Sequence, residues 1–287
     1  MAQPRIAIAT CADYPELKGD DELLCEALRA RGCEAESVVW DEKGVEWSST
    51  NLCLVRSTWD YHDKYERFLA WTREVEATTA LHNPAGLIAW NSDKSYLRQL
   101  TERGVRTVPT LWVEPGSDLD LATALAERSW EEAVVKPTVD LGAKNLHRVR
   151  AGDEVQGALE DVLTRGKAMV QPFFPSLEAE GELSLIYIEG NLSHAVRKRP
   201  ANGDFRVQSI WGGTFAAAES GAKQEALAKQ ALATLTEPPL YARIDLVNDL
   251  EDNPALIELE LIEPNLYLST NPTATDRLAE AVLKRLS

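Results

Sequence analysis

Two carboxylates and one amide near the C-terminus have the residue types of a metal site. Asp245 lies in one apolar run, and Glu263 and Asn265 close the next run after a loop rich in Asp, Asn and Pro. If the two runs pair as a hairpin, the three side chains converge and offer the hard oxygen ligands that Mg²⁺ prefers. The alternative is an acidic hairpin facing solvent, because other carboxylates lie between positions 249 and 260.

Basic side chains that precede these carboxylates in the sequence have the opposite charge. Lys136 sits in the apolar run Val134–Pro137, where a buried ammonium needs an anionic partner. A lysine that only extends from a strand end to water is the alternative. A second basic stretch runs from Lys198 to Arg206 and is followed by two glycines. For Arg199 we favour a basic surface loop, and for Arg206 we favour a functional role.

Hydrophobic periodicity predicts three regions that would position these side chains. The first region, 1–92, alternates strands and helices, which is typical of a parallel α/β sheet with ligands beyond the carboxyl ends of its strands. The second, 93–171, reads as a small α+β lobe, and the third, 172–287, as long antiparallel strands. The expected strands are 6–9, 38–40, 52–55, 110–113, 133–136, 146–149, 168–171, 183–188, 192–196, 241–247 and 256–262. The expected helices are 20–31, 65–76, 91–100, 119–126, 154–163, 223–235 and 275–286.

Composition narrows the class of protein. The formal net charge of −16 argues against nucleic-acid or anionic-membrane partners, because phosphate binding needs surplus Lys and Arg. The four cysteines show no paired spacing, so buried reduced thiols are expected. No apolar run is long enough to cross a bilayer, and the first residues do not resemble a signal peptide. We therefore expect a cytoplasmic protein.

The order of these motifs resembles the ATP-grasp superfamily over nearly the whole chain. Arg-Ile-Asp at 243–245, followed by a strand that ends in Glu-x-Asn, is similar to the metal-binding end of D-alanine–D-alanine ligase and bacterial glutathione synthetase. The resemblance implies an ATP-grasp fold with an N-terminal pre-ATP-grasp domain. It also implies that Asp245, Glu263 and Asn265 hold two Mg²⁺ ions, with Arg243 facing the transferred phosphoryl group.

The same resemblance assigns the remaining nucleotide contacts. The Gly-Asp-Phe-Arg stretch and Gly212-Gly213 are similar to ribosomal-protein glutamate ligases, which places Lys198 and Arg206 on the phosphates and the acyl phosphate. The other residues that it implies for ATP are Lys94, Lys136, the adenine hinge of Gln171, Pro172, Phe173 and Phe174, and the ribose-binding Glu182. The phosphate-covering loop departs from the family, because 138–145 offers only Gly142 as its tip.

The N-terminal region resembles the O-ureido-D-serine cyclo-ligase family, which closes an amino-acid derivative into D-cycloserine. The resemblance lies in the Arg-Ser-Thr-Trp-Asp-Tyr string at 56–61 and in 193–200. It makes Arg56, Asp60 and Tyr61 the expected substrate contacts, with Asp60 on a substrate ammonium. For Trp59 and Tyr61, ordinary packing of a loop is an equal alternative.

The expected function is therefore ATP- and Mg²⁺-dependent ligation of a carboxylate to an amine through an acyl phosphate on a small substrate. Two alternatives stay open, namely an amino-acid ligase for peptide or protein tails and an ATP-binding module without catalysis. Relatives are often dimers or tetramers, so a homo-oligomer is left open as well. The sequence shows no interface signature.

Overall fold

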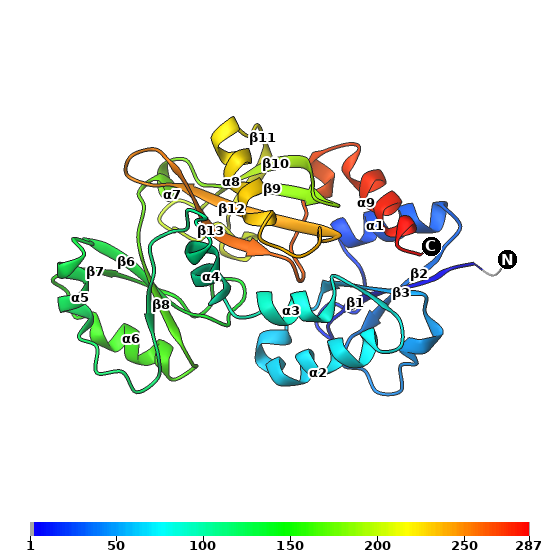
Figure 1. Cartoon of the computed structure of the whole chain (residues 1–287), viewed down its shortest axis with the longest axis horizontal. Helices are drawn as coiled ribbons and strands as arrows, with labels where there is room; N and C mark the ends of the chain where they lie inside the picture. Colours follow the sequence, from blue (N-terminus) through cyan, green and yellow to red (C-terminus); the bar gives the residue numbers. More distant parts are fainter. Residues whose placement is uncertain (1–2, 287) are drawn as a thin grey trace.

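The computed structural model describes residues 3–286 and sets three β-sheets along an elongated molecule (Figure 1). A four-stranded sheet in the order β2-β1-β3-β4 comes first, and a second four-stranded sheet has the order β5-β8-β6-β7. The third is five-stranded, with the order β11-β10-β9-β12-β13. Three sheets in succession agree with the three predicted regions, while the proposed limits at residues 92 and 171 stay predictions.

The first sheet is parallel throughout, as its strand–helix alternation predicted. Strands β1 and β3 are almost wholly buried, as expected for strands covered on both faces. The elements of this region are β1 (Arg5–Thr10), α1 (Asp20–Ala30), β2 (Glu34–Val39), β3 (Leu52–Ser57), α2 (Tyr65–Glu76), β4 (Ala80–His82) and α3 (Ala85–Asn91). The segment that follows β3 therefore starts at the carboxyl edge of the sheet.

The helix expected over 91–100 is wrong in its bounds. Two short helices, α3 and α4 (Tyr96–Glu102), are separated by a turn at 92–95. In this turn the Asp93 carboxylate accepts hydrogen bonds from the Ser95 amide (2.9 Å) and hydroxyl (2.6 Å). Such side-chain bonds to the backbone compete with helical hydrogen bonds. The break sets Lys94 outside both helices.

The second sheet carries its own core. Its elements are β5 (Leu111–Val113), α5 (Leu121–Glu127), β6 (Glu132–Pro137), β7 (His147–Arg150), α6 (Gln156–Leu163) and β8 (Ala168–Pro172). The buried apolar cluster under α5 and α6 is drawn from residues 113–170 alone. This central lobe is thus a separate packing unit.

The third sheet is antiparallel and contains the predicted hairpin of β12 and β13. Its elements are α7 (Ser176–Ala179), β9 (Glu182–Ile188), β10 (Asn191–Arg199), β11 (Thr214–Ala218), α8 (Ala222–Leu232), β12 (Tyr241–Asn248), β13 (Pro254–Glu260) and α9 (Ala274–Lys284). The edge strand β11 was not expected from the sequence, because its Thr-Phe-Ala-Ala-Ala run has no clear alternation.

The first and third regions share hydrophobic cores. One cluster joins residues of β1, β3 and α1 to residues of β9, β10 and α9. Helix α4 packs its Tyr96, Leu97 and Leu100 in a cluster drawn mainly from the third region. In Figure 1, α9 accordingly lies against α1 although the two are far apart in sequence. Over residues 3–286, none of the helices has the length and apolar character to span a bilayer.

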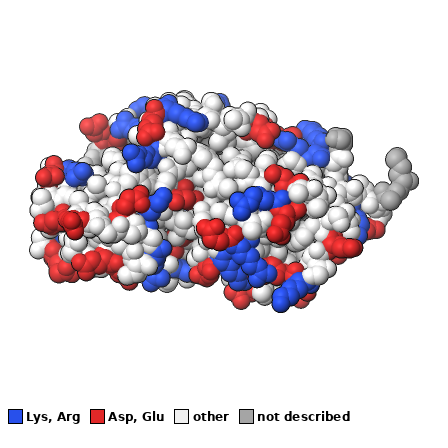
Figure 2. Space-filling view, turned by 60° about the horizontal axis from the view of Figure 1, so that its bottom comes forward, with Lys and Arg blue, Asp and Glu red and all other residues white. Residues whose placement is uncertain are grey.

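The surface charge is mixed on the face that Figure 2 shows. Groups of Lys and Arg side chains on this face lie next to Asp and Glu side chains. Acidic residues outnumber basic ones in the sequence as a whole, 46 to 30. A net negative charge of this kind repels polyanions on average. That nucleic acid is not a partner stays a prediction.

Candidate active site

A cavity of about 480 Å³ is lined by residues from all three regions. Loops after β1 and β3 form one end, β6 and the loop over 140–146 form the other, and β9, β10, β12 and β13 form the floor. Every predicted site residue except Arg56 lines this cavity. The structure therefore brings together side chains that lie far apart in sequence.

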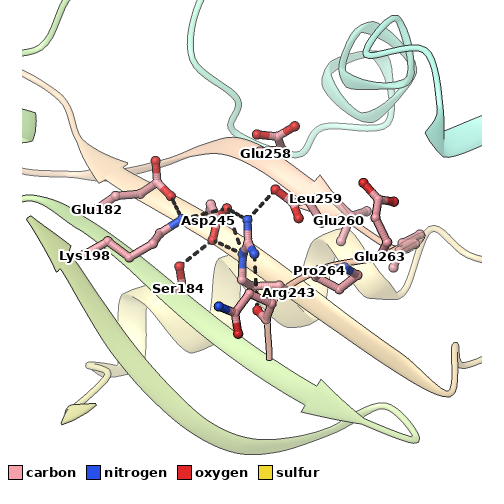
Figure 3. Close-up of polar contacts among 12 residues, drawn as sticks. Glu182, Ser184, Lys198, Arg243, Asp245, Glu258, Leu259, Glu260, Glu263 and Pro264 are labelled. Carbon is pink, nitrogen blue, oxygen red and sulfur yellow. Dashed lines mark hydrogen bonds and ion pairs between the residues drawn. The ribbon is translucent and has the colours of Figure 1, made fainter. Parts of the chain in front are cut away.

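Buried ion pairs organise the floor of the cavity (Figure 3). The Asp245 carboxylate accepts hydrogen bonds from Arg243 Nη2 (2.9 Å), Lys198 Nζ (3.1 Å) and the Ser184 hydroxyl (2.5 Å). Lys198 also pairs with Glu182. Because antiparallel partners on one face lie side by side, β9, β10 and β12 hold these groups in register.

The charges within this network perturb one another. Burial alone would raise the pKa of Asp245, but Arg243 and Lys198 outweigh burial and lower it. Burial raises the pKa of Glu182 against the opposing charge of Lys198. Burial would lower the pKa of Lys198, but Asp245 and Glu182 outweigh it and raise that pKa. Asp245 and Lys198 are thus held in their charged forms.

Three carboxylates converge beside Arg243. Oxygens of Asp245, Glu258 and Glu260 lie within 4.8 Å of one another, the spacing of a group that can hold a metal ion. The register explains the grouping, because Asp245 faces Glu258 and Arg243 faces Glu260 across the β12–β13 pair. Arg243 also forms an ion pair with Glu260. Glu258 and Glu260 were not among the predicted ligands, although their period-two spacing on one strand face is a signal that could have identified them.

Glu263 and Asn265, the other two predicted metal ligands, lie beyond this group. Glu263 is buried and lines the cavity, whereas Asn265 is exposed. The Asn265 side-chain oxygen accepts a hydrogen bond from the Tyr267 amide (3.0 Å), and its carbonyl accepts one from Arg243 (3.2 Å). Their role as metal ligands stays a prediction, while the geometry groups Asp245 with Glu258 and Glu260.

The two predicted ATP lysines both reach the cavity but differ in their partners. Lys94 Nζ donates to the Asp140 carbonyl (2.7 Å) and pairs with Glu258 (3.2 Å). The Lys136 ammonium has no hydrogen-bond or ion-pair partner among residues 3–286. Burial lowers the pKa of Lys136, and the nearby Glu258 opposes this effect. An unpaired ammonium inside a cavity is suited to an anionic ligand.

The predicted adenine hinge follows β8. Gln171 is buried and donates to the Thr110 hydroxyl (3.0 Å), and Pro172 ends the strand. The Phe173 amide donates to the Glu132 carbonyl (2.9 Å). The Phe174 amide has no acceptor in the described part of the chain, so the hinge retains a backbone donor for a ligand. Glu182, the predicted ribose contact, is instead engaged by Lys198.

The loop that carries Gly142 and the segment that carries Arg206 and Trp211 meet over one end of the cavity. We call it the phosphate end, because the ATP phosphates are expected there. Gly142 has a positive φ of 70°, and its carbonyl accepts a hydrogen bond from Trp211 Nε1 (2.8 Å). Arg206 pairs with Asp204 (2.7 Å) and lies over the Trp211 ring, with Cζ 3.6 Å from the ring centre. The central lobe and the third region are therefore connected across the cavity through Trp211, a residue that the sequence did not single out.

The end of the cavity formed by the loops after β1 and β3 is called the substrate end here. The three residues predicted to contact the substrate differ in their position relative to this end. Tyr61 is buried and lines the cavity. Asp60 also lines it, but Trp40 Nε1 (2.7 Å) and Lys64 Nζ (2.6 Å) occupy its two oxygens. Asp60 is therefore engaged by the chain itself, and its role at a substrate ammonium stays a prediction.

Arg56 lies outside the cavity lining. It donates to Asp21 (2.7 Å) and to the Pro264 carbonyl (2.9 Å), so it holds the segment that carries Glu263. Sequence position alone could not distinguish such a supporting contact from a substrate contact.

Comparison with known proteins agrees with this geometry. Residues 6–83 match the family model of the N-terminal domain of D-cycloserine synthetase DcsG. Residues 117–265 match the model of the prokaryotic glutathione synthetase ATP-grasp domain. The chain belongs to the ATP-grasp ligase family. It is an enzyme of the carbon–nitrogen ligase class, as its sequence predicted.

Individual relatives of this ATP-grasp ligase include a cycloserine biosynthesis protein and a glutathione synthetase. It is 32% identical to the cycloserine biosynthesis protein DcsG of Streptomyces lavendulae over 98% of both chains. It is 28% identical to a glutathione synthetase of Prochlorococcus marinus, over 90% of this chain and 85% of that protein. The crystal structure of D-cycloserine synthetase DcsG superposes with a TM-score of 0.88 at 31% identity, covering 99% of this chain and 100% of that one.

A more distant structure shares the fold. D-alanine–D-alanine ligase from Bacillus anthracis gives a TM-score of 0.73 at 14% identity, over 99% of this chain and 97% of that one. The predicted ATP-grasp architecture is therefore confirmed. ATP-dependent ligation of a carboxylate to an amine is the general reaction of this family.

Proposed function

We propose that this ATP-grasp ligase activates the carboxylate of a small amino-acid derivative as an acyl phosphate and closes it intramolecularly. The specific reaction proposed is cyclisation of O-ureido-D-serine to D-cycloserine. Similarity to DcsG along the whole chain supports this choice. The observation that carries the chemistry is the convergence of Asp245, Glu258 and Glu260 beside Arg243, in the cavity that also contains Lys136.

The three carboxylates fit a Mg²⁺ site. All their donors are hard oxygens, and Glu258 and Glu260 point to one face of a rigid strand beside Asp245. When bound, Mg²⁺ would neutralise charge on the ATP phosphates. Arg243, Lys198 and Lys94 already pair with these carboxylates, so a divalent cation would share their oxygens with those side chains.

The cationic side chains of the chain bind and orient the nucleotide. Lys136 offers its unpaired ammonium to a phosphate, and the hinge offers the Phe174 amide to the adenine edge. Arg243 is fixed by Asp245 and Glu260, so its guanidinium meets developing negative charge without reorganising. In this arrangement a substrate carboxylate oxygen attacks the γ-phosphorus of ATP, and the bond to ADP breaks.

Ring closure then follows at the activated carboxyl carbon. The nitrogen of O-ureido-D-serine that is bonded to oxygen attacks this carbon, inorganic phosphate leaves with the electron pair of the broken bond, and the nitrogen loses its proton to solvent or to phosphate. The ring nitrogen still carries the carbamoyl group, and hydrolysis of that N–C bond by one water molecule then releases carbon dioxide and ammonia and leaves D-cycloserine. Water competes with the nitrogen, because acyl phosphates hydrolyse. Closure of the loops linked by Trp211 and Gly142 over this end would exclude it.

A ligase for peptide or protein tails remains the second candidate function. The aromatic side chains Tyr14, Trp59 and Tyr61 line the substrate end of the cavity. An aromatic wall of this kind favours a small substrate over a peptide tail. Peptide acceptors therefore serve as a comparison in the test.

The test is ADP release from Mg-ATP with O-ureido-D-serine, other amino acids and dipeptides. The double variant Asp245→Asn, Glu258→Gln removes two carboxylates of the cluster, and Glu251→Gln on the exposed β12–β13 turn is its matched control. We expect O-ureido-D-serine to stimulate ADP release and the double variant alone to abolish it. Stimulation by dipeptides only would favour the tail ligase. ATP binding without release on any carboxylate would leave a binding module.

A further inference from the structure

Glu263 is a buried carboxylate without a partner. Its residue is 6% exposed, it lines the cavity, and no described residue donates a hydrogen bond or an ion pair to its side chain. Figure 3 shows its carboxylate beyond Glu260, pointing away from the network of Arg243 and Asp245. A desolvated carboxylate in this state is costly unless a ligand compensates it.

The cations around Glu263 are already engaged. Lys94 pairs with Glu258, Arg243 pairs with Asp245 and Glu260, and these contacts account for the nearest positive charges on the floor. Burial and the charge of Glu260 raise the pKa of Glu263 well above its usual range. A cation from outside the chain would favour the charged form of Glu263, because the nearest cations of the chain are paired elsewhere.

The surroundings of Glu263 suit an organic cation. Tyr61 is buried with its ring stacked on Phe68 (4.8 Å between centres), and its hydroxyl has no partner in the described part of the chain. Trp59 donates from Nε1 to the Glu263 carbonyl (3.4 Å) and packs edge-on against Tyr14 (4.9 Å). Aromatic faces attract ammonium groups, and the tyrosine oxygen can accept a hydrogen bond from one.

We propose that the Glu263 carboxylate and the Tyr61 hydroxyl bind the primary ammonium group of the substrate. This inference rests on the proposed function and names the substrate class of the same site. Amino acids are bound with the ammonium at Glu263 and the carboxylate toward Arg243. Both carboxylate oxygens of Asp60, the expected ammonium partner, are already engaged by Lys64 and Trp40.

Binding at Glu263 also selects the nitrogen that reacts. A primary ammonium held against a carboxylate keeps its proton and has no lone pair with which to attack the acyl phosphate. The attacking nitrogen must therefore be a second, uncharged nitrogen of the substrate. The site thus accepts amino acids with a further nucleophilic nitrogen and protects their primary amine from reaction.

The experiment compares two substrates on Glu263→Gln. One is O-ureido-D-serine, and the other is the same molecule with hydrogen in place of the primary amine. Losing the charge opposite a buried ammonium should raise KM for O-ureido-D-serine about 100-fold. We expect no change in KM for the des-amino compound, in KM for ATP or in half-saturation by Mg²⁺. Equal slowing of both substrates with a raised Mg²⁺ requirement would make Glu263 a metal ligand and overturn the inference.

Two further variants keep this test decisive. Tyr61→Phe removes only the hydroxyl and should raise KM for the amine-bearing substrate several-fold, so it carries the test if Glu263→Gln does not fold. Glu258→Gln is the matched control, which should raise the Mg²⁺ requirement and leave the preference between the two substrates intact.

Direct binding separates this inference from the proposed function. Calorimetric titration with D-serine requires no turnover. Binding to the wild type that Glu263→Gln abolishes would support the ammonium site even if ADP is never released. Turnover of O-ureido-D-serine with the same KM in Glu263→Gln would overturn the ammonium site and leave the ligase function intact. Neither turnover nor binding of either compound by the wild type would overturn both.

Discussion

The phosphate end and the substrate end of the cavity are built differently. At the phosphate end, strands β9, β10, β12 and β13 carry charged groups that pair with one another, such as Lys198 with Glu182 and Asp245. At the substrate end, loops carry aromatic side chains around Glu263, which has no partner on the described part of the chain. Lys136 shares this unpaired state, although it lies on β6.

This contrast separates two uses of buried charge. Paired charges hold the floor together, and their loss leaves a partner uncompensated. Unpaired buried charges do not stabilise the fold, and they are available to ligands. Replacing one lysine of each kind tests this distinction. Loss of the paired lysine should lower the stability of the protein, and loss of the unpaired lysine should lower its affinity for the ligand.

The largest effect is expected for Lys198→Met. This change leaves Glu182 and Asp245 buried without their ammonium, and breaking a buried pair in this way costs about 3–5 kcal/mol of the free energy of unfolding. Chemical denaturation monitored by tryptophan fluorescence measures that loss. A control is Lys229→Met, whose pairing with Glu225 on α8 is solvent-exposed. Equal stability of the two variants would show that the network is not structural.

Lys136→Met should act on ligand binding instead. Because its loss leaves no partner uncompensated, the free energy of unfolding should stay within about 0.5 kcal/mol of the wild type or rise slightly. We expect KM for ATP to rise by about 10- to 100-fold, as for the loss of a charge-assisted phosphate contact. Steady-state ADP release across ATP concentrations tests this, and a large loss of stability with unchanged KM would reverse the comparison.

The smallest effect concerns pH. Burial lowers the pKa of Lys136, so the free enzyme loses this charge at a lower alkaline pH than an exposed lysine would. Since phosphate binding requires the protonated form, ATP affinity should be full below that pKa and weaken as the pH rises through it. Lys136→Arg should bind ATP with a flatter alkaline profile, because arginine stays protonated. Identical profiles from calorimetry would exclude Lys136 as the titrating group.

The sequence predicted the structure best where the alternation of side chains along a strand and the pairing of strands determine it. The β12–β13 hairpin and the place of Asp245 and Arg243 followed from two apolar runs and a turn. The choice among acidic residues on β13 needed the register, which brings Glu258 and Glu260 to Asp245. The short motif at Glu263 and Asn265 lies beyond that alternation, and its role in metal binding stays a prediction.

The loops were harder to interpret. Arg56 follows the carboxyl edge of β3, as predicted, yet it turns inward to Asp21 and the Pro264 carbonyl. Such contacts join residues 35 and 208 positions apart, and no local pattern encodes them. The contact between Trp211 and Gly142 is of the same kind. The sequence indicated which residues surround the cavity better than it indicated their partners.

The packing of α9 against α1 has a consequence for the order of events in catalysis. The first and third regions share a core, whereas the central lobe has its own, so the lobe over 111–172 is the part that can move as a unit. The proposed ammonium site lies between the two regions that are packed together, so its walls would be in place before ATP binds. Under the proposed function, a substrate would then be held first, and a movement of the central lobe would bring the γ-phosphate to it.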